Sequence, residues 1–252
     1  MGSFLLETRG LSKWFGGLLA SNNISLCVRP GETHALIGPN GAGKTTLINL
    51  LQGEIRPDAG ELMFDGRDIT RLPRHARAKI GMARTFQITS VFPEMTALNN
   101  VAIATQMQQG HSFRFFRDAA GDVGLTEPSY AALEAVGLSQ RANDLVAELS
   151  HGERRQLELA MAIAMKPKLL LLDEPMAGMG RQDSARMTEL LRQLKQHHTI
   201  VLIEHDMDAV FALADRLSVL VSGQIIATGE PDAIRSDKKV QAAYLGHAGS
   251  VH

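Results

Sequence analysis

The chain has 252 residues, of which 44% are hydrophobic and 21% charged, and its formal net charge at pH 7 is −1. This composition is ordinary for a soluble globular protein, and the near-neutral charge argues against a broad nucleic-acid-binding surface. The single cysteine, Cys27, excludes an internal disulfide and a thiolate metal cluster. The longest apolar runs, such as residues 169–172, are too short to cross a bilayer, so we expect other chains to supply any membrane-spanning part.

The N-terminal part of the chain begins with short strands and one helix. Residues 33–38 (THALIG) are an apolar run that predicts a buried strand, and residues 44–53 predict a helix that ends at Gly53. Residues 60–66 alternate between polar and apolar side chains and are bounded by glycines, which predicts a further strand.

The middle of the chain, from about residue 92 to residue 148, changes to helical segments with little strand character. Residues 130–138 (YAALEAVGL) predict one of these helices, which ends near Gly137. Residues 111–118 (HSFRFFRD) mix aromatic side chains with arginines. This segment is interpreted either as an amphipathic helix face or as a contact with a membrane subunit or lipid headgroups.

The C-terminal part alternates apolar strands with helical stretches. The predicted strands are continuous apolar runs, as expected for strands buried on both faces of a parallel sheet; they span residues 168–174, 199–205 and 217–223. Helices are expected at 183–195 and 206–214, and residues 222–224 (SGQ) predict a hairpin turn. The alternation indicates an α/β sheet, so the chain is predicted to have an α/β core with a helical block inserted near its middle.

A glycine-rich motif follows the first predicted strand. It matches G-x-x-x-x-G-K-[ST], a pattern whose backbone N–H groups cradle phosphates when a strand precedes it and a helix follows. Lys44 is expected to reach the β- and γ-phosphates and the Thr45 hydroxyl to bind Mg²⁺. The motif comprises Gly38, Pro39, Asn40, Gly41, Ala42, Gly43, Lys44, Thr45 and Thr46.

Polar side chains follow two of the C-terminal strands. Asp173 and Glu174 end the strand LLLLDE, and ligands of parallel sheets bind beyond the carboxyl ends of strands. Asp173 is expected to hold Mg²⁺ and Glu174 to orient or deprotonate an attacking water. His205 follows the next strand, where it suits a contact with the γ-phosphate, although a lone histidine is more often structural.

Residues 149–160 (LSHGERRQLELA) admit two interpretations. Ser150 and Glu153 form an S-x-x-E capping box ahead of an apolar-striped helix. A helix N-terminus is also a site where anions bind, because its N–H groups are free and carry positive partial charge. The two interpretations are compatible if Ser150 caps the helix in the monomer and meets phosphate in a dimer.

Taken together, these motifs resemble those of the ATP-binding-cassette (ABC) family over nearly the whole chain. The resemblance implies a P-loop NTPase (RecA-like) core with an antiparallel β subdomain, formed by residues 1–91 and 151–252, and an inserted helical subdomain over residues 92–150. It implies ATP and Mg²⁺ as ligands and ATP hydrolysis as the activity. Gln87 resembles the Q-loop glutamine, with a catalytic and Mg²⁺-related role, and His205 the switch histidine. Phe15 is placed like the aromatic residue that stacks on adenine; Trp14 is a rival, and a strand-edge core position is the alternative for Phe15.

LSHGE resembles the family signature, usually LSGGQ, which contacts ATP bound by a second ATPase subunit. The resemblance implies that Ser150, His151, Gly152 and Glu153 contribute to that site. His151 and Glu153 depart from the usual glycine and glutamine, and the charge of Glu153 is unfavourable beside phosphate unless it turns back into the capping box. Gly180 stands where the family commonly has aspartate, which places cross-talk between the two sites in doubt.

Further segments, among them KWFGGLLA, MARTFQ and VQAAYLG, are similar to the ATP-binding subunits of branched-chain amino acid importers. The expected function is that of an ATPase subunit peripheral to the cytoplasmic face of the inner or plasma membrane. Its expected partners are permease subunits, an identical or different second ATPase subunit and, indirectly, a solute-binding protein, but no nucleic acid. Urea import, lipid or lipopolysaccharide export, and a soluble non-transport ATPase acting on nucleic acid or ribosomes remain as alternatives.

Overall fold

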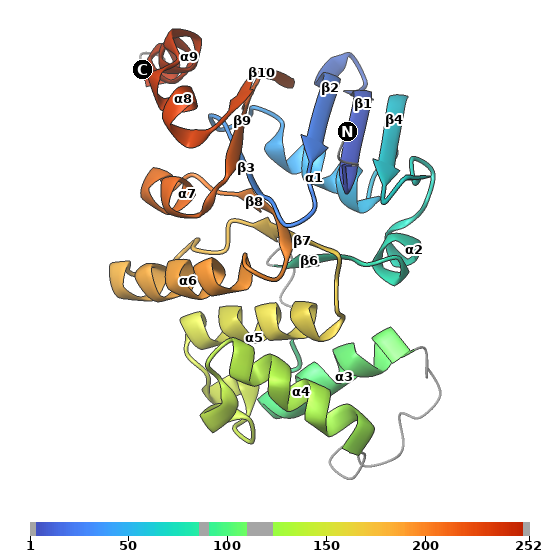
Figure 1. Ribbon diagram of the computed structural model, residues 1–252, viewed down its shortest axis with the longest axis vertical. Coiled ribbons are helices and arrows are strands. Elements are labelled where there is room, and N and C mark those ends of the chain that lie inside the picture. Colours follow the sequence, from blue (N-terminus) through green and yellow to red (C-terminus); the bar gives the residue numbers. More distant parts are fainter. Residues whose placement is uncertain (1–3, 86–90, 110–122, 249–252) are drawn as a thin grey trace.

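The computed structural model describes residues 4–85, 91–109 and 123–248. Two sheets and a set of helices are arranged in layers (Figure 1). The antiparallel sheet and the strands of the larger sheet occupy the upper half of the view, and helices α3, α4 and α5 form the lower end. The described part of the chain therefore combines an α/β body with a helical end.

The larger sheet has six strands in the order β10-β9-β3-β8-β7-β6. All neighbours are parallel except β10 and β9, which form an antiparallel hairpin. Its strands are β3 (Thr33–Ile37), β6 (Met82–Thr85), β7 (Leu169–Asp173), β8 (Thr199–Ile203), β9 (Arg216–Val221) and β10 (Gln224–Gly229). The predicted strands β3, β7, β8 and β9 and the predicted hairpin are confirmed, with Ser222 and Gly223 both at positive φ in the turn.

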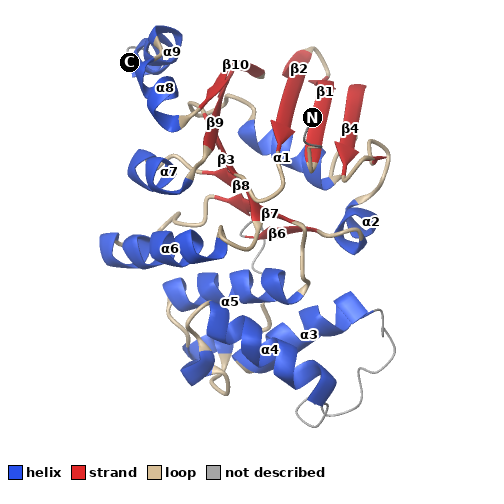
Figure 2. Cartoon of the chain, in the orientation of Figure 1, coloured by secondary structure: helices blue, strands red, loops and turns tan. Residues whose placement is uncertain are grey.

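The smaller sheet is antiparallel, with the order β2-β1-β4-β5 (Figure 2). Its strands are β1 (Leu6–Phe15), β2 (Leu18–Val28), β4 (Ala59–Phe64) and β5 (Arg67–Asp68). Helix α1 (Lys44–Gln52) packs between the two sheets, because its buried face shares one hydrophobic core with residues such as Leu62 and Val201. The helix ends at Gly53 with a φ of 82°, as the sequence predicts.

A second hydrophobic core lies on the other face of the six-stranded sheet and continues into the helical end. Its helices are α3 (Ala97–Gln109), α4 (Val123–Ala135), α5 (His151–Ala164), α6 (Arg181–Leu194) and α7 (Met207–Leu213). The helices predicted at 130–138, 183–195 and 206–214 correspond to α4, α6 and α7. Helix α5 packs against both α3 and α4, so it joins the helical end to the sheet.

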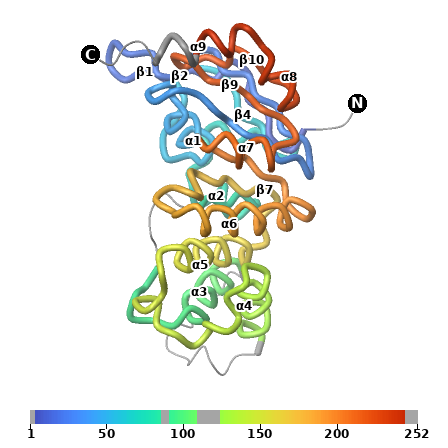
Figure 3. Tube along the Cα trace, turned by 90° about the vertical axis from the view of Figure 1, so that its left-hand side faces the viewer, coloured from blue at the N-terminus to red at the C-terminus, as the bar shows by residue number. Residues whose placement is uncertain are grey.

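Three short helices and two 3₁₀ turns complete the described structure. They are α2 (Arg74–Lys79), η2 (Ser139–Arg141), η3 (Val146–Glu148), α8 (Pro231–Ser236) and α9 (Lys238–Ala248). Strand β6 and helices α8 and α9 are not among the elements predicted from the sequence. The tube view shows α8 and α9 beside β10 at the end of the molecule opposite α3 and α4 (Figure 3).

Candidate functional site

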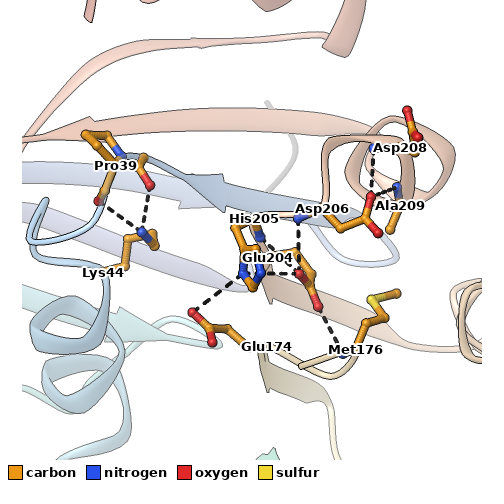
Figure 4. A network of polar contacts seen from close by, with 10 residues as sticks. Pro39, Lys44, Glu174, Met176, Glu204, His205, Asp206, Asp208 and Ala209 are labelled. Carbon is orange, nitrogen blue, oxygen red and sulfur yellow. Dashed lines mark hydrogen bonds and ion pairs between the residues drawn. The ribbon is translucent and has the colours of Figure 1, made fainter. Parts of the chain in front are cut away.

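The carboxyl ends of strands β3, β7 and β8 meet at one edge of the six-stranded sheet. Asp173, the last residue of β7, is paired with Ile203, the last residue of β8, and β8 is also the neighbour of β3. The phosphate-binding motif follows β3 directly, and His205 follows β8. This topology brings the motif, the acidic pair and the histidine to the edge where ligands of parallel sheets bind. Figure 4 shows Lys44, Glu174 and His205 at this edge.

The glycine-rich loop needs its glycines for close backbone packing. A Cβ atom at Gly38 would lie 2.1 Å from the carbonyl oxygen of Leu220, and one at Gly43 would lie 2.7 Å from that of Ala20. Gly43 is also the N-cap of α1, with a φ of 103°, no side-chain cap and no acidic residue in the first turn. The N–H groups at the start of α1 therefore have no competing side-chain acceptor from this helix, which suits a phosphate.

Lys44 reaches back across the loop from the first residue of α1. Its ammonium donates to the carbonyl oxygens of Gly38 at 2.6 Å and Pro39 at 3.1 Å (Figure 4). Burial lowers the pKa of Lys44, and the negative charges of Glu174 and Asp173 oppose this shift. The loop thus holds a positive charge beside the backbone groups that suit phosphate.

Glu174 adopts an unusual backbone conformation for a residue with a side chain. Its φ is 50°, in the left-handed region, and its N–H donates to the carbonyl oxygen of Ile203 at 2.9 Å. Its carboxylate is partly exposed, with Oε1 3.9 Å from Nδ1 of the exposed side chain of His205. The structure therefore brings these two predicted residues together at the open edge of the sheet.

Asp173 has a partner that the sequence interpretation missed. Arg84 of β6 donates from Nη2 to Asp173 Oδ2 at 2.6 Å, and from Nη1 to the side chains of Asn49 and Gln52 on α1. The Arg84 side chain is 2% exposed, and burial lowers its pKa while Asp173 opposes the shift. A charged residue within a buried strand is rare unless it is paired, but this signal could be used only once residues 82–85 were known to form strand β6.

The residues at this edge fit a hard cation bound together with phosphate. The Thr45 side chain lies at the start of α1, and the Asp173 carboxylate lies at the end of β7, so both offer oxygen atoms. In the three described ranges, no group of three or more His, Cys, Asp or Glu side chains could hold a metal by itself. Mg²⁺ is commonly held by one or two carboxylates and substrate phosphates rather than by a protein cage. Gln87, the other predicted metal-related residue, lies outside the described residues.

Phe15 and Trp14 lie at the end of β1, and both are exposed, by 48% and 43% respectively. Lys13 places its ammonium 5.7 Å from the centroid of the Phe15 ring, and it also pairs with Asp58. Neither aromatic residue is part of the hydrophobic cores, so the alternative of a core position for Phe15 is wrong. Both aromatic side chains are thus partly open to a ligand, and the Lys13 ammonium lies over the Phe15 ring.

The helix start at residues 150–153 forms the complete capping box. Ser150 Oγ accepts from the Glu153 N–H at 3.3 Å, and the Glu153 carboxylate accepts from the Ser150 N–H at 2.8 Å. The bond from the Ser150 N–H holds the pKa of Glu153 below its ordinary value, and Arg141 lies 2.9 Å from the other carboxylate oxygen. The charge of Glu153 is therefore turned back into the cap. This is the arrangement in which its charge does not oppose a phosphate at the helix start.

This helix start is not close to the phosphate loop of the same chain. Helix α5 lies on the far side of the six-stranded sheet from α1 in both views (Figures 1 and 3). His151 instead approaches the loop after β7, with Nε2 3.4 Å from the carbonyl oxygen of Ala177. The structure thus assembles the phosphate loop, Asp173, Glu174 and His205, and leaves residues 150–153 apart from them.

Residues 21–177, more than half of the chain, match the family described as ABC transporter. The chain belongs to the ABC transporter family. A second match covers residues 224–250 and is described as branched-chain amino acid ATP-binding cassette transporter. The family model thus spans the phosphate loop, the helix start at residues 150–153 and the acidic pair.

Two curated relatives of this ABC protein cover nearly its whole length. It is 40% identical to the high-affinity branched-chain amino acid transport ATP-binding protein LivG of Escherichia coli strain K12, over 97% of this chain and 98% of the relative. It is 39% identical to the high-affinity branched-chain amino acid transport ATP-binding protein BraF of Pseudomonas aeruginosa, over 97% of this chain and 98% of the relative.

Among solved structures, the ADP conformation of MJ1267, an ATP-binding cassette of an ABC transporter, superposes with a TM-score of 0.85. The two sequences are 31% identical, and the match covers 97% of this chain and 99% of that one. Together with the family match, this likeness identifies the α/β body as the P-loop NTPase fold of ABC cassettes, and such domains bind nucleotide.

No helix in the described ranges has both the length and the apolar character needed to cross a membrane. The aromatic and arginine-rich segment at residues 111–118 lies outside the described residues, so its two interpretations stay open.

The phosphate loop, the acidic pair, His205 and the capping box were all predicted from the sequence. The sequence interpretation missed Arg84, the buried arginine that pairs with Asp173.

Proposed function

We propose that this chain is the ATP-binding and ATP-hydrolysing subunit of an ABC importer for branched-chain or related amino acids. The observation that carries the proposal is the match to LivG over almost the full length of both chains. The separate match of residues 224–250 to a branched-chain amino acid cassette supports the same substrate class from a different part of the chain.

The geometry supports a division of labour at the sheet edge. We assign the phosphates to the loop of residues 38–46, where N–H groups of α1 and the Lys44 ammonium converge. The Glu174 carboxylate is partly exposed beside His205, so it is available to orient and deprotonate an attacking water while the imidazole contacts the γ-phosphate. The exposed ring of Phe15, with Trp14 beside it, is suited to stack on the adenine.

We assign Mg²⁺ to Thr45, Asp173 and the Q-loop glutamine Gln87. When bound, the cation would supply positive charge to the phosphate oxygens. Arg84 holds one carboxylate oxygen of Asp173 and so fixes the direction in which the other oxygen faces. Gln87 enters this assignment from the sequence alone.

We further propose that two such subunits bind two ATP molecules between them. In that arrangement Ser150, His151, Gly152 and Glu153 of one chain would face the ATP bound by the other. The separation of α5 from α1 within one chain supports this arrangement, because the two helices pack in different cores on opposite faces of the six-stranded sheet. Ser150 Oγ and the Gly152 N–H are the donors offered to the second phosphate site.

The remaining parts of the proposal concern location and partners. We divide the cassette into an ATPase core with its β subdomain, residues 1–91 and 151–252, and a helical subdomain, residues 92–150, that contacts the permease. The subunit is placed at the cytoplasmic face of the membrane, and the solute-binding protein delivers the amino acid to the permease without touching this chain.

Uptake of labelled leucine, isoleucine, valine and urea tests the transport class in cells that lack this subunit and redundant importers. We expect restoration of the chain to restore uptake of the three amino acids, and Lys44→Ala to serve as the inactive control. Restoration of urea uptake alone would move the assignment to urea import. No change in any of the four solutes would contradict import of this substrate class.

The Glu174→Gln variant tests the hydrolytic assignment and the paired arrangement together. We expect it to bind ATP but to hydrolyse it at least about 10²-fold more slowly, because the general base is lost. Light scattering should then show a dimer at saturating ATP if the two subunits are identical. A variant with wild-type turnover would contradict the role of Glu174, and a monomer would contradict the homodimer.

A further inference from the structure

Glu204 is a buried carboxylate that lies directly after strand β8 and directly before His205. We propose that Glu204 is a positioning residue that holds the backbone of the Glu174 loop and of His205 in one fixed arrangement. The proposal rests on the proposed ATPase function and adds to it a residue outside the phosphate loop, the acidic pair and the signature. Figure 4 shows Glu204 with its carboxylate directed toward both segments.

The carboxylate of Glu204 accepts three backbone hydrogen bonds. Oε1 accepts from the Met176 N–H at 3.0 Å, and Oε2 accepts from the N–H groups of His205 at 2.9 Å and Asp206 at 3.3 Å. Glu204 as a whole is 1% exposed. Because burial of an ionised carboxylate is costly unless its oxygens are hydrogen-bonded, these three N–H groups account for its presence in the interior.

The first consequence concerns the strained backbone of Glu174. The end of β8 holds this backbone on both sides, since Ile203 accepts from the Glu174 N–H and Glu204 accepts from the N–H of Met176, two residues later. Glu174 has a φ of 50°, a conformation that persists only where the surroundings restrain it. The bond to Met176 is a side-chain restraint on this loop, so its loss would free the loop to relax.

The second consequence concerns His205. Glu204 Oε2 binds the His205 and Asp206 amides, and Asp206 in turn caps α7 by accepting from the N–H groups of Asp208 and Ala209. The His205 N–H is thus held by Glu204, and the imidazole, 66% exposed, has its Nδ1 3.7 Å from Glu204 Oε2. The Glu204 carboxylate therefore sets the position of both the Glu174 loop and His205. Oε1 of Glu174 and Nδ1 of His205 are 3.9 Å apart.

The test is the Glu204→Gln variant of the full-length chain, studied alone and in complex with its membrane partners. The amide NH₂ that replaces one oxygen is a donor and faces N–H donors, so at least one anchor is lost without a change in size. We expect kcat for ATP hydrolysis to fall by roughly tenfold to 10²-fold, as expected for a misplaced catalytic group, while KM for ATP changes less than about twofold. We also expect faster hydrogen exchange at the amide of Met176, or at the amides of His205 and Asp206 where the glutamine oxygen stays on Met176.

Glu32→Gln is the matched control. Glu32 is another buried carboxylate, 6% exposed, that accepts from the Arg29 N–H and pairs with His34. It precedes β3 and so lies at the opposite edge of the sheet from the phosphate loop. We expect this variant to melt at a lower temperature but to keep the kcat of the wild type and the exchange rate of Met176.

The outcomes separate the proposal from the function on which it rests. A Glu204→Gln variant with kcat within about twofold of the wild type, or with unchanged hydrogen exchange at all three amides, those of Met176, His205 and Asp206, would overturn the positioning role. Equal losses of kcat in both variants would overturn it also, since they would report only on folding. If Glu204→Gln does not fold, Glu204→Asp keeps the charge with a shorter reach and is expected to show the same split between kcat and KM. If the wild type itself hydrolyses no ATP, the proposed function fails, and hydrogen exchange at these three amides still decides whether Glu204 anchors the backbone.

Discussion

Helices α1 and α5 both begin where phosphate is expected, but their first turns are built differently. Helix α1 begins after Gly43 with no side-chain cap and no acidic residue in its first turn. Helix α5 begins after Ser150, with a closed capping box and Glu153 in its first turn. At the start of α5 the box thus occupies the N–H groups of Ser150 and Glu153, whereas no side chain of α1 caps the N–H groups at its own start.

The difference teaches how a helix start is prepared for a ligand. The start of α1 is supported from outside the helix, by loop glycines packed against Leu220 and Ala20, so its own N–H groups remain available. At the start of α5 the box occupies the N–H groups of Ser150 and Glu153, while the Gly152 N–H takes no part in it. A phosphate there meets a Ser150 hydroxyl that already accepts one hydrogen bond. The Ser150 half of the box is the longer bond, at 3.3 Å against 2.8 Å for the Glu153 half, so Ser150 is the partner more easily released.

The largest effect is expected at the open helix start. Lys44→Ala removes the ammonium that spans the phosphate loop and should lower ATPase turnover by at least about 10²-fold, because a positioned charge in the site is lost. Turnover and binding of a fluorescent ATP analogue are the measurements. The exposed Lys79 of α2 provides the control, since Lys79→Ala should leave both unchanged. Full turnover by Lys44→Ala would contradict the assignment of the phosphates to the open start of α1.

A smaller effect is expected from Arg84, which braces α1 against Asp173. Arg84→Lys keeps the charge, but one ammonium cannot replace the guanidinium fork between Asp173, Asn49 and Gln52. We expect a loss of about 1–3 kcal/mol in the free energy of unfolding, and a changed Mg²⁺ concentration for half-maximal ATP binding, measured by calorimetry.

Arg77 supplies the control for Arg84. It is also buried and braces the end of α1, but through the carbonyl oxygens of Leu50 and Leu51 rather than through Asp173. Arg77→Lys should therefore destabilise the fold without moving the Mg²⁺ dependence. The same Mg²⁺ shift in both variants would show that Arg84 acts on the fold alone.

The next effect separates the cap at α5 from a phosphate contact. Ser150→Ala should cost about 0.5–2 kcal/mol of stability as a lost cap, and should reduce turnover per folded molecule by more than this loss explains. Asp237→Ala is the matched control, because Asp237 accepts from the N–H groups of Lys239 and Val240 at the start of α9. If both variants melt earlier and neither loses turnover, Ser150 is only a cap.

The smallest effect is expected at Glu153. Because its pKa is lowered in the folded chain, mainly by the Ser150 N–H, its ionised form stabilises the fold at neutral pH. This contribution is present above the ordinary value of 4.5 and is lost as the pH falls through the lowered pKa. Glu153→Gln should therefore lose about 1 kcal/mol or less at pH 7 relative to the wild type, with a difference that shrinks under acid conditions.

Urea unfolding at pH 7, and then at steps down through the acid range, measures this difference. Glu134→Gln on the exposed face of α4 is the control and should leave the unfolding free energy at pH 7 unchanged. ATPase turnover of Glu153→Gln should stay within about twofold of the wild type, because Glu153 serves the second site through the cap that places Ser150, and glutamine can also close that cap. A large gain in turnover would show that this charge does oppose phosphate at the open end of α5.

The sequence by itself determined the features whose causes are local. The capping box was predictable because Ser150 and Glu153 are three residues apart, and the end of α1 because Gly53 accepts a left-handed conformation. Strands β3, β7 and β8 were predictable because strands buried on both faces are continuously apolar. The glycine-rich motif located the phosphate loop for the same local reason.

Only the tertiary structure decided the contacts between distant segments. Strand β6 was missed because Arg84 interrupts its apolar pattern, and that arginine is tolerated only because Asp173, 89 positions away in the chain, pairs with it. Nothing in the sequence distinguishes Glu204 from other acidic residues. Its proposed positioning role depends on the hydrogen bond from the Met176 N–H, 28 positions earlier in the chain. A buried charge is stable only when its partners are in place, and the fold, rather than the neighbouring residues, brings those partners.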